Sequence, residues 1–139
     1  IDCYSKYSWG FALKKKTAEE VLSCFKKICH LEGPPAILHT DNGAEFANGL
    51  LESFCEEMNI LVIHGRPRHP QSQGQIERFN QTVSRKLSKS LYGDKEKAWS
   101  LILDDMVYAY NLAIHRATKR TPFCLFRNRD GYNAYKVRY

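Results

Sequence analysis

Short apolar runs alternate along this chain with longer stretches whose apolar residues recur every third or fourth position, and this pattern limits the possible folds most strongly. Recurrence at three and four residues is typical of a helix that buries one face, whereas a short apolar run between turn residues indicates a buried strand. The pattern predicts a helix after the capping box of Thr17 and Glu20, and a second helix over residues 46–58. Buried strands are predicted at residues 36–38 and 60–63.

A further strand and two further helices are predicted in the rest of the chain. Trp9, Phe11 and Leu13 alternate with small residues, as in a strand with one filled face. Helical stripes recur at Ile76, Phe79, Val83 and Leu87, and again at Trp99, Ile102, Leu103, Met106, Val107, Tyr110 and Ile114. Residues 65–74 predict a surface loop. We therefore expect one α/β domain with helices covering a sheet, and the opening of the chain inside a strand predicts that an edge of this sheet is missing.

Composition limits the class of protein only loosely. Twenty-one Lys and Arg against fifteen Asp and Glu give a net charge of +6, which makes polyanions candidate partners, although dispersed charges usually mark a solvated surface. No apolar run approaches the ~20 residues that span a bilayer and no targeting segment is visible, so we expect an intracellular protein, nuclear or cytoplasmic, with no membrane partner. The five cysteines form no C-x-x-C pair and predict mostly buried free thiols.

Two carboxylates stand at positions that suit a metal site. Asp41 ends a predicted strand beside a turn, Glu77 lies in the first turns of the third predicted helix, and thirty-five residues separate them. Mg²⁺ takes oxygen ligands and is usually held by one or two carboxylates together with substrate phosphates, so this pair predicts metal-dependent phosphoryl transfer. Taken singly, each residue has a simpler interpretation, since Asp-Asn-Gly is a common tight turn and an exposed helical glutamate is usually only solvated.

The third predicted helix carries a polar face opposite its apolar stripe. Because successive helical residues turn by about 100°, this face contains Gln73, Glu77, Asn80 or Gln81, and Ser84. Basic residues flank the face, namely Arg78, Arg85, Lys86 and Lys89. Such residues neutralise phosphates and hold a nucleic-acid backbone without reading its sequence. The helix is therefore a candidate DNA-binding surface, with Arg78 and Lys86 as phosphate contacts.

Two motifs at this separation connect the chain with a known family. The first is His39-Thr40-Asp41-Asn42-Gly43, and the second runs from Pro70-Gln71-Ser72-Gln73-Gly74 through Glu77 to Asn80. With Asp2 to Tyr7 and Tyr110 to Phe123, they resemble the integrase catalytic core of retroviruses and gypsy-type retrotransposons, a member of the RNase H-like superfamily. The resemblance covers nearly the whole chain. It implies an α/β fold, an RNase H-like mixed sheet flanked by helices, here lacking its first strand.

The resemblance also implies roles for individual residues. Asp41 matches the second and Glu77 the third carboxylate of the D,D-35-E triad, which binds two Mg²⁺ or Mn²⁺ ions, and Gln73 and Asn80 match positions that contact DNA. The first catalytic aspartate of the family precedes the segment that Asp2 resembles. Asp2 is therefore expected to be structural, the alternative being that it is the first metal ligand.

The activity implied by this resemblance is DNA integration by metal-dependent strand transfer, with element ends and target DNA as partners and a homo-oligomer as the assembly. The chain is expected to hold the core alone, without the zinc-binding and C-terminal modules of the family. Two other interpretations stay open. One is a host-adopted, non-enzymatic relative that binds DNA or protein, and the other is an RNase H-like nuclease or transposase acting on other nucleic acid.

Overall fold

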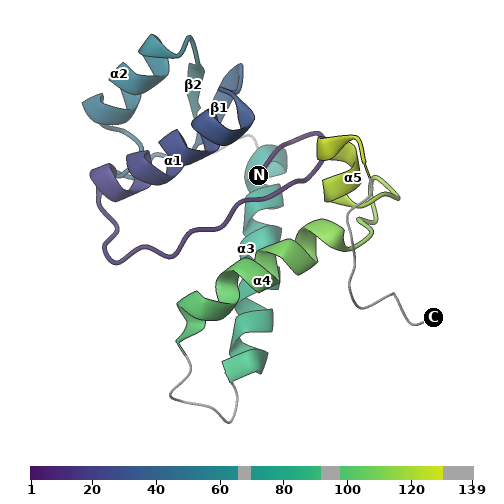
Figure 1. Cartoon of the computed structure of the whole chain (residues 1–139). Helices are drawn as coiled ribbons and strands as arrows, with labels where there is room; N and C mark the ends of the chain where they lie inside the picture. Colours follow the sequence, from purple (N-terminus) through teal and green to yellow (C-terminus); the bar gives the residue numbers. More distant parts are fainter. Residues whose placement is uncertain (66–69, 92–97, 130–139) are drawn as a thin grey trace, which may run out of the picture. The chain divides into compact units, whose positions relative to one another are not determined.

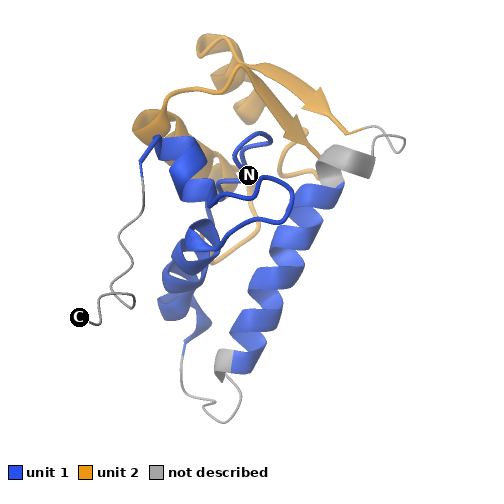
Figure 2. Ribbon diagram, turned by 90° about the vertical axis from the view of Figure 1, so that its right-hand side faces the viewer, with its two compact units in different colours: residues 1–10, 74–139 blue, residues 11–73 orange. Residues whose placement is uncertain are grey.

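Two compact units make up the protein (Figure 2). The computed structural model describes residues 1–65, 70–91 and 98–129. Unit 1 combines residues 1–10 with residues 74–139, and unit 2 contains residues 11–73. Each unit has a hydrophobic cluster of its own.

Unit 2 contains two helices and two strands (Figure 1). Their order is α1 (Ala18–Glu32), β1 (Ile37–Thr40), α2 (Gly49–Glu57) and β2 (Leu61–His64). The predicted start of α1 is confirmed, because the side chain of Thr17 accepts a hydrogen bond from the Glu20 backbone N–H. The Glu20 carboxylate accepts from the backbone N–H groups of Lys14 and Lys15, at 3.0 and 3.1 Å, so it anchors the segment that leads into the helix.

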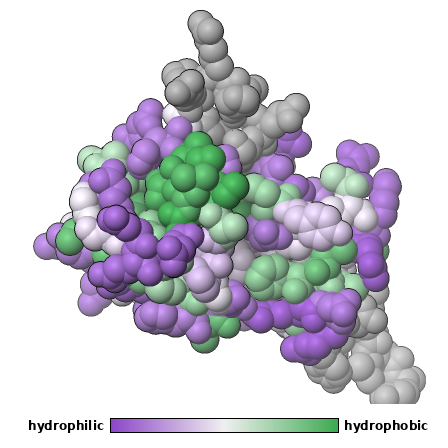
Figure 3. Space-filling view, turned by 90° about the horizontal axis from the view of Figure 1, so that it is seen from above, coloured by the Kyte–Doolittle hydropathy of each residue, from purple (hydrophilic) through white to green (hydrophobic). Residues whose placement is uncertain are grey.

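The sheet of unit 2 consists of β1 and β2, which pair in parallel from Ile37 opposite Leu61 to Thr40 opposite His64. Leu38 and Val62 pack against the cluster that α1 and α2 bury, formed around Cys29, Leu51, Phe54, Cys55 and Ile60. The prediction that both strands are buried was wrong for the other face, where Ile37 and Leu61 are 47% and 59% exposed. Alternation of side chains sends neighbouring residues to opposite faces, and both helices pack on one of them. Figure 3, which views the molecule from above, shows hydrophobic residues gathered in a green patch on the surface.

Unit 1 is helical. It contains most of α3 (Pro70–Leu91), α4 (Trp99–Leu112) and the short α5 (Pro122–Arg127). Phe79 and Val83 of α3 pack against Leu103 and Val107 of α4, and the ring of Tyr110 meets that of Phe79 edge-on, with the centroids 4.9 Å apart. The two predicted helical stripes of this region are therefore confirmed as a shared core in their central residues, whereas Ile76 and Trp99 at their beginnings are 36% and 45% exposed. Within the described ranges, none of the helices is both long and apolar enough to cross a membrane.

The strand predicted at residues 9–13 is absent, and residues 2–7, which resemble a family strand, contain a turn instead. Between these two segments, the backbone of Ser8 is bonded by a side chain of α4 instead of by a neighbouring strand. The backbone N–H of Ser8 donates to Oδ1 of Asn111 and its carbonyl accepts from Nδ2 of Asn111, both at 2.9 Å and both buried. The ring of Tyr7 stacks on that of Phe126, with the centroids 4.6 Å apart. Contacts with helices therefore replace strand pairing.

The loop predicted over residues 65–74 was wrong from Pro70 onward, because α3 begins there. Proline suits the first turn of a helix, where its missing N–H would have no helical partner. Residues 66–69 lie outside the described part of the chain. The stripe of α4 was predicted to reach Ile114, but the helix ends at Leu112 and Ile114 is 72% exposed, since the backbone is already extended at Ala113.

Candidate metal-binding and DNA-binding residues

Asp41 follows β1 directly, at the carboxyl end of the parallel strands, as predicted. Its Oδ1 accepts a hydrogen bond of 3.1 Å from the backbone N–H of Gly43, so the Asp-Asn-Gly segment does form the expected tight turn. The Nδ2 of Asn42 donates to the carbonyl of Gly65, just after β2, at 3.3 Å. The turn is thus tied to the ends of both strands. The carboxylate is exposed, and a carboxylate has two oxygens, so one turn bond is compatible with metal binding.

A second carboxylate lies close to this turn and was missed from the sequence. Glu45 Oε1 is 2.5 Å from Nζ of Lys16, and the Glu45 side chain is 10% exposed while that of Lys16 is 75% exposed. The hydrogen bond from Lys16 lowers the pKa of Glu45. The same bond raises the pKa of Lys16, and the negative charge of Asp41 adds to this effect. The sequence placed Lys16 in a run of three lysines, which gave no sign of a partner.

Glu77 lies on the polar face of α3, where the sequence placed it. Glu77, Asn80, Gln81 and Ser84 are all exposed, whereas Phe79 and Val83 are 5% and 7% exposed. The flanking Arg78 is exposed and Lys86 is half-buried. Gln73 belongs to α3, but its side chain lies outside the described part of the chain. The predicted separation into a core stripe and a polar face is confirmed for the described residues.

Asp41 belongs to unit 2 and Glu77 to unit 1. The positions of the two units relative to one another are not determined, so a shared ion between these carboxylates stays a prediction. Within the described residues, no three His, Cys, Asp or Glu side chains group as metal ligands. The two predicted ligands fit Mg²⁺ or Mn²⁺ in their chemistry, because both are exposed carboxylates and these ions prefer oxygen.

Asp2, the alternative first ligand, is engaged in a local turn. Its Oδ2 accepts from the backbone N–H of Ser5 at 2.7 Å and from the Ser5 hydroxyl at 2.5 Å, and Ser5 is 1% exposed. These contacts place Asp2 in a local turn, and its expected structural role stays a prediction. The neighbouring Lys6 donates to Oε1 of Gln75 on α3 at 3.0 Å, a contact between distant segments that the sequence could not reveal.

His115 follows α4 in unit 1, and its Nδ1 is buried with no hydrogen-bond partner among the residues that the structure describes. Burial lowers the pKa of this imidazole, and the positive charges of Lys6 and Arg78 lower it further. The side chain is therefore kept neutral over a wider pH range than an ordinary histidine.

All five cysteines are free thiols. The predicted burial is confirmed for Cys29 and Cys55 and wrong for Cys3, which is exposed. Burial raises the pKa of the Cys29 and Cys55 thiols. These two groups therefore behave as small apolar side chains of the core rather than as nucleophiles.

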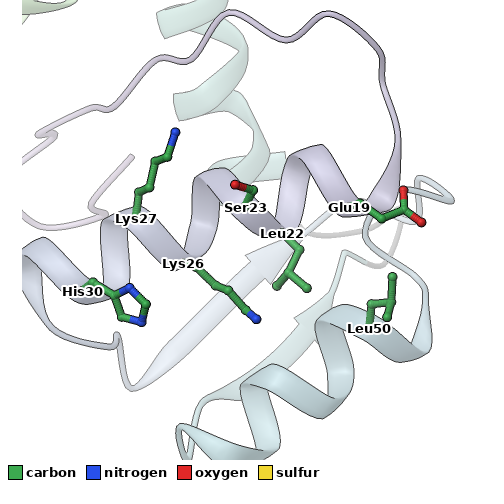
Figure 4. Close-up of a pocket in the computed structure, with 7 residues that line it drawn as sticks. All are labelled: Glu19, Leu22, Ser23, Lys26, Lys27, His30 and Leu50. Atoms are coloured by element: carbon green, nitrogen blue, oxygen red, sulfur yellow. The ribbon is translucent and has the colours of Figure 1, made fainter.

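A cavity of about 430 Å³ lies on unit 2 (Figure 4). The helix α1 supplies most of its lining, and α2 adds Leu50. The lining residues are Glu19, Leu22, Ser23, Lys26, Lys27, His30 and Leu50. None of them is a predicted metal or DNA ligand.

Comparisons with known proteins identify the family. The family described as the integrase core domain matches residues 1–70, which include Asp41. The Pro-Pol polyprotein of feline foamy virus is 31% identical over 124 residues, covering 88% of this chain and 10% of that polyprotein. The Tf2-3 transposon polyprotein of Schizosaccharomyces pombe is 32% identical over 125 residues, covering 88% and 9%. The chain belongs to the integrase core domain family, and it spans about a tenth of the length of these curated relatives.

Solved structures show the same fold. The catalytic core domain of BIV integrase is similar with a TM-score of 0.74 and 24% identity, over 89% of this chain and 80% of that one. The HTLV-2 integrase catalytic core in complex with magnesium, in a trimeric form, is similar with a TM-score of 0.65 and 24% identity, over 79% and 70%. The predicted RNase H-like α/β class is confirmed, with two parallel strands in the described residues. At the level of the family, the chain belongs among proteins of DNA integration.

Proposed function

We propose that this chain is the catalytic core of a D,D-35-E integrase, which joins DNA by metal-dependent phosphodiester strand transfer. The observation that carries the proposal is the position of Asp41 at the end of β1, in a turn that hydrogen bonds hold to the ends of both strands, in a chain of the integrase core family. Glu77 on the exposed face of α3 supplies the second ligand at the expected sequence separation. These carboxylates would hold Mg²⁺ or Mn²⁺, two ions in the complete site.

The bound ions would supply Lewis-acid activation of the attacking oxygen and charge stabilisation at the leaving one. The residues of the chain would fix the geometry. The hydrogen bond from Gly43 limits rotation of the Asp41 carboxylate, and the helical backbone of α3 fixes the direction of Glu77. A pre-oriented carboxylate loses less conformational entropy on binding a cation.

DNA, both element ends and target, is the proposed partner, and α3 is the proposed contact surface. Arg78 and Lys86 would neutralise phosphates, while Asn80 and Gln73 would donate hydrogen bonds to the nucleic acid. Among the described residues within one helical turn of Glu77 on α3, Arg78 is the one charged side chain, and the others are neutral. We also propose a homo-oligomer, as for the trimeric HTLV-2 core, and a nuclear or cytoplasmic location.

Strand transfer on a short duplex with Mn²⁺ tests this function. The comparison is between the chain itself, a version extended at its N-terminus with the first strand of the family and its aspartate, and the Glu77→Gln variant of that extended version. We expect joined products from the extended version alone, because Asp41 and Glu77 provide a charge of only −2 against two divalent ions. Joining by the unextended chain would make Asp2 the first ligand. Loss of joining in all three proteins, with DNA binding kept, would favour the host-adopted, non-enzymatic relative.

A further inference from the structure

Two carboxylates lie against the same residue of the Asp41 turn. Asp41 Oδ1 is 3.1 Å from the backbone nitrogen of Gly43. On the other side, a Cβ added to Gly43 would lie 2.8 Å from the Glu45 carboxyl carbon and from both of its oxygens. The Glu45 carboxylate therefore packs against Gly43, the residue whose backbone N–H donates to Asp41.

Hydrogen bonds fix the backbone from which the Glu45 side chain extends. The carbonyl of Gly43 accepts hydrogen bonds from the N–H groups of Phe46 and Ala47, at 2.8 and 2.9 Å. The Nδ2 of Asn48 donates to the Glu45 carbonyl at 2.8 Å, and Oδ1 of the same residue caps α2. Glu45 thus belongs to a tight turn fixed at both ends, and its side chain is 10% exposed.

The Lys16 ammonium is paired with Glu45 and also interacts electrostatically with the Asp41 carboxylate. This ammonium forms the 2.5 Å ion pair with Glu45, while the rest of the side chain is largely exposed and free to take other rotamers. An ammonium next to Asp41 would occupy the same negative potential that attracts a divalent cation. The partner that Lys16 takes therefore matters for the availability of Asp41.

We propose that Glu45 is a positioning residue of the metal site, which holds the Lys16 ammonium away from Asp41 and so keeps the Asp41 carboxylate available to a divalent cation. The proposal rests on the proposed function, in which Asp41 is a metal ligand. Without the Glu45 charge, Lys16 would pair with Asp41 instead and would compete with the metal. If Glu45 and Lys16 were both replaced by neutral residues, no ammonium would compete, and the Asp41 carboxylate would again be available to the metal.

Mn²⁺ added to the ¹⁵N-labelled 139-residue chain tests the proposal, with paramagnetic broadening of the Gly43 amide signal as the readout. We expect Glu45→Gln to raise the Mn²⁺ concentration for half-broadening at least threefold. The double variant Glu45→Gln/Lys16→Met should return within twofold of the unmodified chain. The matched control Glu45→Gln/Lys15→Met removes a neighbouring lysine of the same run and should stay as weak as Glu45→Gln.

Each outcome separates this proposal from others. Unchanged broadening in Glu45→Gln would overturn the proposal. It would also be overturned if the double variant Glu45→Gln/Lys16→Met bound Mn²⁺ as weakly as Glu45→Gln, which is the result expected if the substitution collapses the turn. Lys16→Met alone should bind Mn²⁺ at least as well as the unmodified chain, and weaker binding would also contradict the proposal. Asp41→Asn tests the metal site itself: if it leaves the broadening unchanged, the proposed function fails at Asp41, whatever Glu45 does.

Discussion

Gly43 is the residue on which the Asp41 turn depends most closely. We expect Gly43→Ala to lower the free energy of unfolding by about 0.5–1 kcal/mol, because the added methyl would lie 2.8 Å from the Glu45 carboxylate and would displace that flexible side chain from Lys16. Urea unfolding measures the change. Gly49→Ala is the matched control, since nothing lies within 4 Å of a Cβ added there. Equal stability of the two variants would show that the turn can relax around the methyl.

His115 gives a second prediction at this scale, a dependence of stability on pH. Its pKa in the folded chain is lowered by burial and by Lys6 and Arg78, so folding favours the neutral imidazole. This contribution to stability is complete above the ordinary histidine pKa of about 6.5 and is lost as the pH falls through the lowered folded value. Urea unfolding at pH 7.5 and pH 5 should therefore show a smaller loss for His115→Gln than for the unmodified chain. An identical loss would contradict the prediction.

Single residues also show where sequence reasoning ends. Asp41 at a strand end and Glu77 on an exposed helical face could be predicted, because both follow from local periodicity. The Lys16–Glu45 and Lys6–Gln75 contacts could not, since each joins segments that only the fold brings together. A charge in a lysine run gives no local signal of its partner.

Among the elements, the helix with a cap and a stop signal and the two strands that follow turn residues were predicted, whereas the strand expected at residues 9–13 is absent. Thr17 caps α1 and Gly33 ends it, with the positive φ of 87° that glycine tolerates. The alternation of Trp9, Phe11 and Leu13 failed as a prediction of a strand: residues 9–13 form none, and the backbone of the preceding Ser8 bonds to the side chain of Asn111. A strand needs a partner for its backbone, and alternation alone does not supply one.

The helix α3 should gain stability from a substitution in its second turn. Gly74 lies inside the helix, and a Cβ added there would meet only the Arg78 guanidinium, at 4.0 Å. We expect Gly74→Ala to raise the free energy of unfolding by about 0.5–1 kcal/mol, since alanine loses less backbone entropy in a helix. Gly33→Ala is the contrasting variant and should destabilise, because its φ is +87° although its surroundings are open. Thermal unfolding of both variants and of the unmodified chain measures these changes. A Gly74→Ala variant that melts at a lower temperature than the unmodified chain would count against a helical first half of α3.

At the scale of the whole molecule, the net charge of +6 becomes testable as DNA binding. We expect weak binding to any duplex, with an affinity that falls steeply as salt rises, because phosphate contacts release counterions. Arg78→Gln and Lys86→Gln should each reduce the slope of log affinity against log salt by about 1. Lys27→Gln on α1 removes the same charge elsewhere and should leave the slope unchanged. Fluorescence anisotropy across a salt series measures the DNA affinity of the unmodified chain and the three variants. Equal slopes in all four proteins would show that Arg78 and Lys86 are ordinary surface residues.

The buried pairing of Ser8 with Asn111 has a consequence for the timing of synthesis. The side-chain amide of Asn111 meets both polar groups of the Ser8 peptide, and 103 residues separate the two positions. At roughly 5–20 residues per second, a ribosome needs about 5 to 20 s to make the partner that Ser8 requires. During that interval the aromatic residues at the start of the chain have no α4 or α5 to pack against. We therefore expect nascent chains stalled before Asn111 to be cut by protease near residues 1–10, and those released after Arg127 to resist.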